Sequence, residues 1–161
     1  MQDQYTEYSL QRLTLAMVLL NAFTTPLMLS AVNVALPAVA KDLSMNAVQL
    51  SWVPMAYLMA SAMFVLIFGR LADMVGRKRI FLIGTSSVIV TSLIGAFSDS
   101  SAMLISARFL QGVSAAMLYA TQVAIVTSVF PPAKRGQAIG LTVSTIYLGL
   151  TIGPVIGGYV I

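Results

Sequence analysis

The chain of 161 residues is 58% hydrophobic and only 9% charged, whereas charged residues make up about a quarter of an ordinary soluble domain. This composition excludes a soluble globule, and we interpret the net charge of +4 as basic loops beside a lipid bilayer, not as a nucleic-acid-binding surface. The chain has no Cys and no His, so we expect no disulfide, no metal site, no cofactor and no enzyme activity.

Five apolar segments are long enough to cross a bilayer, whose hydrocarbon core of about 30 Å requires roughly 20 residues of helix. They are expected at residues 13–36, 48–68, 80–97, 102–130 and 138–161. Polar, Gly or Pro residues follow each of the first four segments, but the fifth runs to the last residue, which we interpret as a truncation. The expected fold class is an all-α membrane protein with five transmembrane helices.

Basic residues are concentrated in alternate loops between these segments, and the opposite loops contain only Lys41. Short loops rich in Lys and Arg stay in the cytoplasm. We therefore expect a multi-pass protein of the plasma membrane with a cytoplasmic N-terminus. The residues that carry this bias are Arg12, Arg70, Arg77, Lys78, Arg79, Lys134 and Arg135.

The first apolar segment carries polar side chains on two faces. Asn21, Thr25 and Met28 share one face, and Asn33 is turned about a third of a circle away from it. Asn and Thr in a membrane helix either hydrogen-bond to neighbouring helices or line a transport pathway. For Thr25 both interpretations stay open, and we regard Asn21 and Asn33 as candidates for the pathway.

The segment after the second apolar stretch has the pattern G-x-L-a-D-x-x-G-R-[RK]-[RK] at residues 69–79. We expect a loop here, in which Gly69 allows close approach of a neighbour, Asp73 caps a helix or pairs with Arg, and Gly76 permits a tight turn. The basic residues that complete the pattern are Arg77, Lys78 and Arg79.

Arg108 is the only charged residue inside an expected span, and at the bilayer centre its cost would be about 2.5–3.5 kcal/mol. Gln111, Tyr119 and Gln122 follow it by 3, 11 and 14 positions, which places all four on one helical face. We expect this polar stripe to line a cavity. The alternative is that Arg108 extends to the membrane interface near Asp99.

The last apolar segment is rich in glycine. Gly149, Gly153 and Gly157 form two overlapping G-x-x-x-G units on one face, so another backbone can approach closely. Pro154 removes a backbone hydrogen bond and is expected to bend the helix. The wider motif also includes Gly140 and Gly158.

Four motifs together carry a resemblance to a known family. The loop pattern at residues 69–79 resembles the signature cytoplasmic loop of the major facilitator superfamily, and R-F-L-Q-G at 108–112 resembles its fourth-helix motif. The glycine spacing over 140–158 matches the motif of its drug–proton antiporter branch. N-V-A-L-P at 33–37, with W-V-P-M-A-Y at 52–57, is similar to the fourteen-helix drug–proton antiporter subfamily.

The resemblance implies an incomplete N-terminal six-helix half of a transporter that works by alternating access. Its implied activity is proton-coupled efflux of small molecules, including drugs. The segment 69–79 would act as a latch, and the glycine face would contact the second half of the transporter. The implied partners are a small-molecule substrate, protons, and the remaining C-terminal helices or a second copy of the chain.

One departure from the subfamily concerns proton coupling. The subfamily usually has Asp where this chain has Met28, and no Asp or Glu lies within any expected span. A coupling carboxylate must therefore lie outside this chain, or the coupling mechanism differs. Two alternatives stay open: a facilitator or uniporter for a metabolite, and a short self-associating membrane protein that serves as a scaffold or half-transporter.

Overall fold

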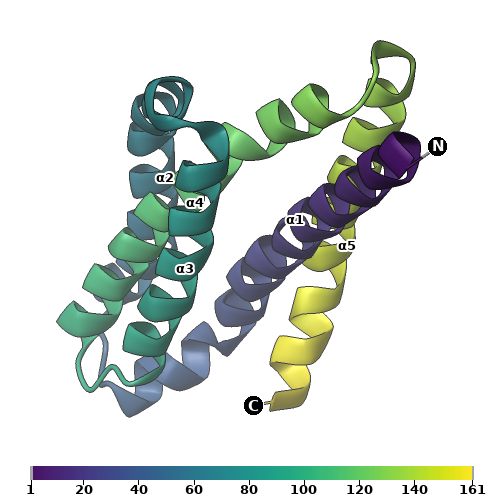
Figure 1. Ribbon diagram of the computed structural model, residues 1–161. Helices are drawn as coiled ribbons and strands as arrows, with labels where there is room; N and C mark the ends of the chain where they lie inside the picture. Colours follow the sequence, from purple (N-terminus) through teal and green to yellow (C-terminus); the bar gives the residue numbers. More distant parts are fainter. Residues whose placement is uncertain (1, 161) are drawn as a thin grey trace.

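The computed structural model describes the backbone of residues 2–160 and the side chains of residues 11–159. This part of the chain forms five α-helices, each long and apolar enough to cross a membrane. They are α1 (Gln2–Asp42), α2 (Ala47–Val75), α3 (Arg77–Ala96), α4 (Ser101–Val129) and α5 (Pro132–Val160), shown in Figure 1. The expected all-α fold with five membrane helices is confirmed.

The segment 69–79 is not a loop, contrary to our expectation. Helix α2 continues to Val75 and α3 begins at Arg77, so that Gly76 alone separates them. Gly76 has a φ of +112°, which a residue with a side chain rarely adopts. Much of the segment before Gly76 consists of residues that favour helix, namely Arg, Leu, Ala and Met. The charged side chains that end the hydrophobic stretch therefore do not end the helix.

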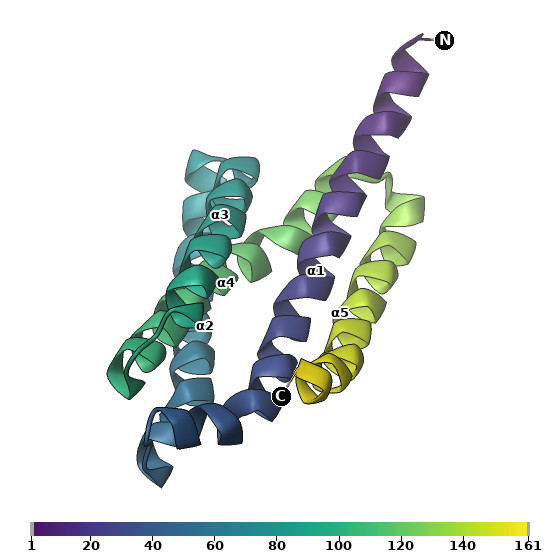
Figure 2. The same ribbon diagram turned by 90° about the horizontal axis from the view of Figure 1, so that it is seen from below.

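The helices form two groups, which both views of the ribbon separate clearly (Figures 1 and 2). In one group α1 packs along α5, and in the other α2 and α3 pack against α4. The C-terminal part of α4 leads across from the second group to the start of α5, where it approaches α1 (Figure 1). Helix α4 therefore joins the two groups at one end, and the C-terminal end of α1, which leads to α2, joins them at the other (Figures 1 and 2).

The contact between α1 and α5 depends on three glycines. A Cβ atom at Gly149 would meet the carbonyl oxygen of Phe23, and one at Gly157 would lie 2.6 Å from the carbonyl oxygen of Ala31. Gly153 lies between them against Leu27, where a Cβ would lie 2.6 Å from the carbonyl oxygen. The close approach that we predicted is present, and its partner within the described residues is α1.

Two other members of the glycine motif lie outside this contact. Nothing lies within 4 Å of a Cβ built on Gly140, and at Gly158 only the Val34 side chain is within that distance. A comparable close approach joins α2 to α4, where a Cβ at Gly112 would meet the carbonyl oxygen of Tyr57. Backbone contacts at small residues thus hold both groups together.

The buried apolar side chains form two clusters at different levels of the bundle. The first connects α1, α3, α4 and α5, and its members are Val18, Phe81, Leu118, Val126 and Ala138. The second connects α1, α2 and α4 through Leu36, Val53 and Leu104.

The two ends of the bundle differ in charge. The end at which α2 meets α3 and α4 meets α5 carries most of the basic residues, and we call it the basic end. The opposite end contains the connections 43–46 and 97–100. There Asn46 caps α2 by accepting a hydrogen bond from the Gln49 backbone N–H at 2.8 Å, and Ser100 caps α4 in the same way.

Candidate functional site

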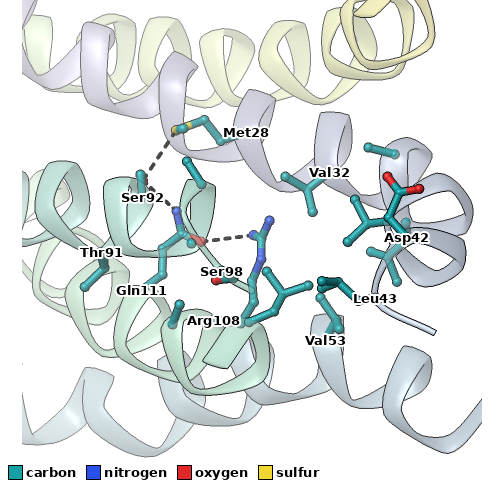
Figure 3. Close-up of a pocket in the computed structure, with 17 residues that line it drawn as sticks. Met28, Val32, Asp42, Leu43, Val53, Thr91, Ser92, Ser98, Arg108 and Gln111 are labelled. Carbon is teal, nitrogen blue, oxygen red and sulfur yellow. Dashed lines mark hydrogen bonds between the residues drawn. The ribbon is translucent and has the colours of Figure 1, made fainter. Parts of the chain in front are cut away.

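A cavity of about 440 Å³ lies between the two helix groups, toward the opposite end of the bundle. Helix α1 contributes an apolar wall that includes Val32 and Leu36, and Val53 of α2 and Leu104 of α4 extend it. The polar side of the cavity comes from α3 and α4, as the close-up in Figure 3 shows. Its volume is within the range of about 300–1,000 Å³ that ligand pockets usually have.

Three hydrogen-bonded side chains and a thioether cross the cavity from α4 to α1 (Figure 3). Arg108 Nη1 donates to Gln111 Oε1 at 3.0 Å, and Gln111 Nε2 donates to Ser92 Oγ at 2.8 Å. Ser92 Oγ then lies 4.0 Å from Met28 Sδ, at the limit for a weak hydrogen bond to sulfur. The amide of Gln111 thereby fixes the guanidinium and connects α4 to α3.

Arg108 is buried, with 8% of its surface exposed, and it lines the cavity. Within the described side chains, the only ion pair joins Asp73 and Arg77, so Arg108 has no carboxylate partner there. The one carboxylate that lines the same cavity belongs to Asp42, an exposed residue at the end of α1. A guanidinium has five N–H donors, and one of those on Arg108 hydrogen-bonds to the Gln111 side chain.

A second, smaller void lies beside the guanidinium on the side of α2. It is lined by Tyr57 and Met28 as well as by Arg108 and Gln111. The Tyr57 hydroxyl is 3.0 Å from the Tyr119 hydroxyl, which joins α2 to α4 next to this void. The polar groups of the site therefore continue from the cavity into the α2–α4 contact.

The two asparagines expected in the pathway do not line the cavity. Asn21 donates to the Met17 carbonyl at 3.0 Å and accepts a hydrogen bond from Thr85 Oγ1 at 3.3 Å, so it connects α1 to α3. Asn33 is exposed on another face of α1. The structure thus gives Asn21 the role of an interhelical hydrogen-bonding group.

The stripe on α4 divides into two parts. Arg108 and Gln111 line the cavity, whereas Tyr119 and Gln122 do not. A rise of 1.5 Å per residue places the last two about 16–21 Å farther along the axis than Arg108, beyond the end of the cavity. Gln122 is buried, and its Nε2 has no partner within the part of the chain that the structure describes.

The sequence analysis missed the contribution of α3. Thr91 and Ser92 both line the cavity, and Ser92 accepts the hydrogen bond from Gln111. Two adjacent hydroxyl residues within an apolar segment were the available signal. That signal is weak, because Ser and Thr in a membrane helix commonly bond to their own backbone, as Thr91 does with the Ser87 carbonyl at 2.8 Å.

The charged motif at the basic end forms a defined contact. Asp73 Oδ1 accepts from Arg77 Nε at 3.0 Å and from Arg77 Nη2 at 2.9 Å, and Arg77 Nη1 donates to the Ala124 carbonyl of α4 at 3.4 Å. Lys78 and Arg79 are exposed, and nothing lies within 4 Å of a Cβ built on Gly69. Within the described residues no neighbour makes the expected close approach at Gly69.

Comparison with known proteins gives a family match over most of the chain. Residues 18–161 match the sequence model of the Major Facilitator Superfamily. The chain is 35% identical to the riboflavin transporter RibZ of Clostridioides difficile, over 92% of this chain and 33% of that protein. It is 36% identical to the multidrug resistance protein Stp of Mycobacterium tuberculosis, over 94% of this chain and 28% of the relative.

A third relative is the multidrug efflux pump LfrA of Mycolicibacterium smegmatis, which is 33% identical over 90% of this chain and 30% of the pump. The chain thus spans about a third or less of the length of the curated relatives that it matches.

Proposed function

The chain belongs to the Major Facilitator Superfamily, and on that premise we propose that it forms the N-terminal part of a secondary transporter that moves small molecules by alternating access. The observation that carries this proposal is the buried Arg108 on the wall of a 440 Å³ cavity between two helix groups. Ionisable side chains within membrane spans face cavities or partners and mark the paths of substrates and ions.

The architecture is consistent with such a pathway. The cavity lies where the α1–α5 group meets the group formed by α2, α3 and α4. Transporters place their substrate sites at the junction between structural units that move relative to one another. We propose that Arg108 and Gln111 contact the substrate.

We further propose that transport is efflux coupled to protons, because two of the relatives carry names that describe multidrug resistance or efflux. A proton-coupled mechanism requires a titratable group in the pathway. Within the described residues the cavity has Asp42 at its rim and Met28, a thioether, beside Arg108. We therefore propose that the coupling carboxylate belongs to a part of the transporter outside this chain.

A second candidate function is a facilitator or uniporter for a metabolite, and the Met28 thioether in the Arg108 network favours it. Such a protein needs no proton-binding group in its pathway. One of the relatives is named as a riboflavin transporter, which shows that single metabolites occur among the substrates of related proteins.

The orientation and partners belong to the same proposal. We propose that the basic end is cytoplasmic and that the protein resides in the plasma membrane. The charged motif around Asp73 and Arg77 would then face the cytoplasm, where it would contact the other half of the transporter. That half would consist of further helices of the same protein or of a second copy.

The experiment that tests this proposal is a flux assay on everted membrane vesicles that contain the full-length gene product, with ethidium and riboflavin as probes. Proton-coupled efflux predicts accumulation that depends on the proton gradient and collapses when a protonophore is added. A facilitator predicts equilibration that the protonophore does not change. Flux equal to that of vesicles without the protein, for both probes, would contradict both candidates for these compounds.

A further inference from the structure

We propose that the cavity binds an amphipathic organic anion, with its acid group on the guanidinium of Arg108 and its apolar body along α1. This inference rests on the proposed function, since it names the substrate class of the same site. It follows from three features of the cavity: an uncompensated positive charge, a fixed orientation of the donors, and an apolar wall.

The first feature is the charge. Arg108 is 8% exposed and makes no ion pair within the described residues. A buried cation without a counter-ion has lost much of its hydration and gained no opposite charge in return. Met28 lines the same cavity but supplies only a thioether. A ligand that brings a carboxylate therefore supplies a counter-ion that the described residues do not provide at this position.

The second feature is the fixed orientation of the guanidinium. Gln111 accepts from Arg108 Nη1 at 3.0 Å and is itself anchored by its 2.8 Å bond to Ser92. Figure 3 shows the guanidinium extending from α4 into the space beside Val32. The guanidinium is planar and is held on one side by Gln111. Its remaining N–H groups are therefore oriented to donate hydrogen bonds to a planar carboxylate.

The third feature is the shape and polarity of the rest of the cavity. Val32 and Leu36 of α1, together with Val53 and Leu104, give it an apolar surface suited to an aromatic or aliphatic body. The Asp42 carboxylate lines the cavity from the exposed end of α1 and would repel a second acid group there. The preferred ligand is therefore a monoanion, not a dianion.

The test compares two probes that share one body and differ in charge. The full-length gene product is reconstituted in nanodiscs of zwitterionic phosphatidylcholine, which excludes anionic lipids, and titrated calorimetrically with 2-naphthoate and with 2-naphthamide. We expect naphthoate to bind at least about tenfold more tightly than naphthamide, because a hydrogen bond to a charged group is stronger than one between neutral groups. Equal affinities would overturn the proposal.

Two comparisons between variants test whether the preference for naphthoate comes from Arg108. Arg108→Gln should bind both probes with equal affinity, whereas the parent protein discriminates between them. Met28→Asp places a carboxylate in the same cavity as Arg108 and should also abolish the preference, whereas Met28→Asn, of nearly the same size but uncharged, should keep it. Both Met28 variants keep Arg108, so they still test the proposal if Arg108→Gln does not fold. A naphthoate preference that survives Met28→Asp would overturn the proposal.

Flux measured on the same proteins, reconstituted in sealed proteoliposomes of phosphatidylcholine, separates this inference from the proposed function. A preference for naphthoate without transport of any probe would retain the anion site and reject transport. Transport without a preference would retain the transporter and reject the anion site.

Discussion

At the scale of single residues, the buried Arg108 hydrogen-bonds to an amide, whereas the usual partner of a buried guanidinium is a carboxylate. Its guanidinium donates to Gln111 at 3.0 Å, and Arg108 forms no ion pair with any of the described residues. Amide oxygens orient a guanidinium but do not neutralise it, so the positive charge stays available to the contents of the cavity. The interpretation of Arg108 as a residue that faces the membrane interface does not agree with its burial.

The first prediction concerns the shape of this cation. Arg108→Lys keeps the charge but loses the planar fork, and Arg108→Ala loses both. We expect Arg108→Ala to reduce flux at least about a hundredfold, and Arg108→Lys to reduce it less, since breaking a buried charged contact costs about 2–5 kcal/mol. Flux into proteoliposomes measures the effect, and size-exclusion profiles confirm folding. Unchanged flux in Arg108→Ala would contradict a role in the pathway.

The second prediction concerns the charged motif at the basic end. Both members of the Asp73–Arg77 pair are well exposed, with side chains 63% and 44% accessible, so the pair contributes little to stability. We expect Asp73→Asn to reduce flux strongly while membrane insertion and thermal stability stay unchanged. Asp99→Asn, the same substitution at an exposed residue of the opposite end, is the matched control. Normal flux in Asp73→Asn would contradict the proposed role of the motif as a latch.

At this scale the sequence singled out Arg108 and Gln111, which both line the cavity, but not Ser92. Arg108 was recognisable because a charged residue within an apolar span almost always faces a cavity or a polar partner. Ser92 was not, since hydroxyl side chains are common in membrane helices and usually bond locally. Tyr119 shares the face of Arg108 but does not line the cavity, because residues on one helical face can lie far apart along the axis, here by about 16 Å.

At the scale of helices, glycine positions determine which elements can pack backbone to backbone. The three glycines of α5 fit against α1, and Gly112 of α4 fits against α2. The glycine spacing predicted the close contact because it depends on the helix alone. It could not predict the partner. Every helix in the bundle is apolar on most of its faces, so hydrophobic periodicity does not indicate which helix packs against the glycines.

The third prediction separates these glycines from others in the same helix. Gly153→Val would place a side chain against the Leu27 carbonyl and should destabilise the α1–α5 contact by about 1–3 kcal/mol. Gly140→Ala is the matched control, because nothing lies within 4 Å of its Cβ position and Ala favours helix. Thermal unfolding in detergent measures both. Equal melting temperatures for the two variants would contradict this packing.

At the scale of the whole molecule, composition and the lengths of the apolar segments were sufficient to predict five membrane helices. Hydropathy did not predict the cavity, because its walls come from four helices that are distant in sequence. It also failed at residues 69–79, where helical structure continues through charged residues almost to Gly76. Charge ends a membrane span but not a helix, and the two boundaries differ wherever a helix extends beyond the bilayer.

The fourth prediction concerns orientation. The chain contains no Cys, so single cysteines introduced into it report accessibility without interference from its own residues. With the basic end in the cytoplasm, Asp99→Cys should react with a membrane-impermeant maleimide in intact cells. Gly136→Cys at the basic end should react only after permeabilisation. The reverse pattern would contradict the proposed orientation.

The central claim is that the cavity between α1 and the α3–α4 pair is the path of the substrate. Its most direct test is transport by the full-length gene product with a single cysteine at Val32, on the cavity wall, before and after reaction with methyl methanethiosulfonate. We expect the modification to block flux, and the transported compound to slow the modification. Leu20→Cys, on the same helix but 66% exposed and outside the cavity, should keep its flux after the same treatment. Full flux through modified Val32→Cys would contradict the claim.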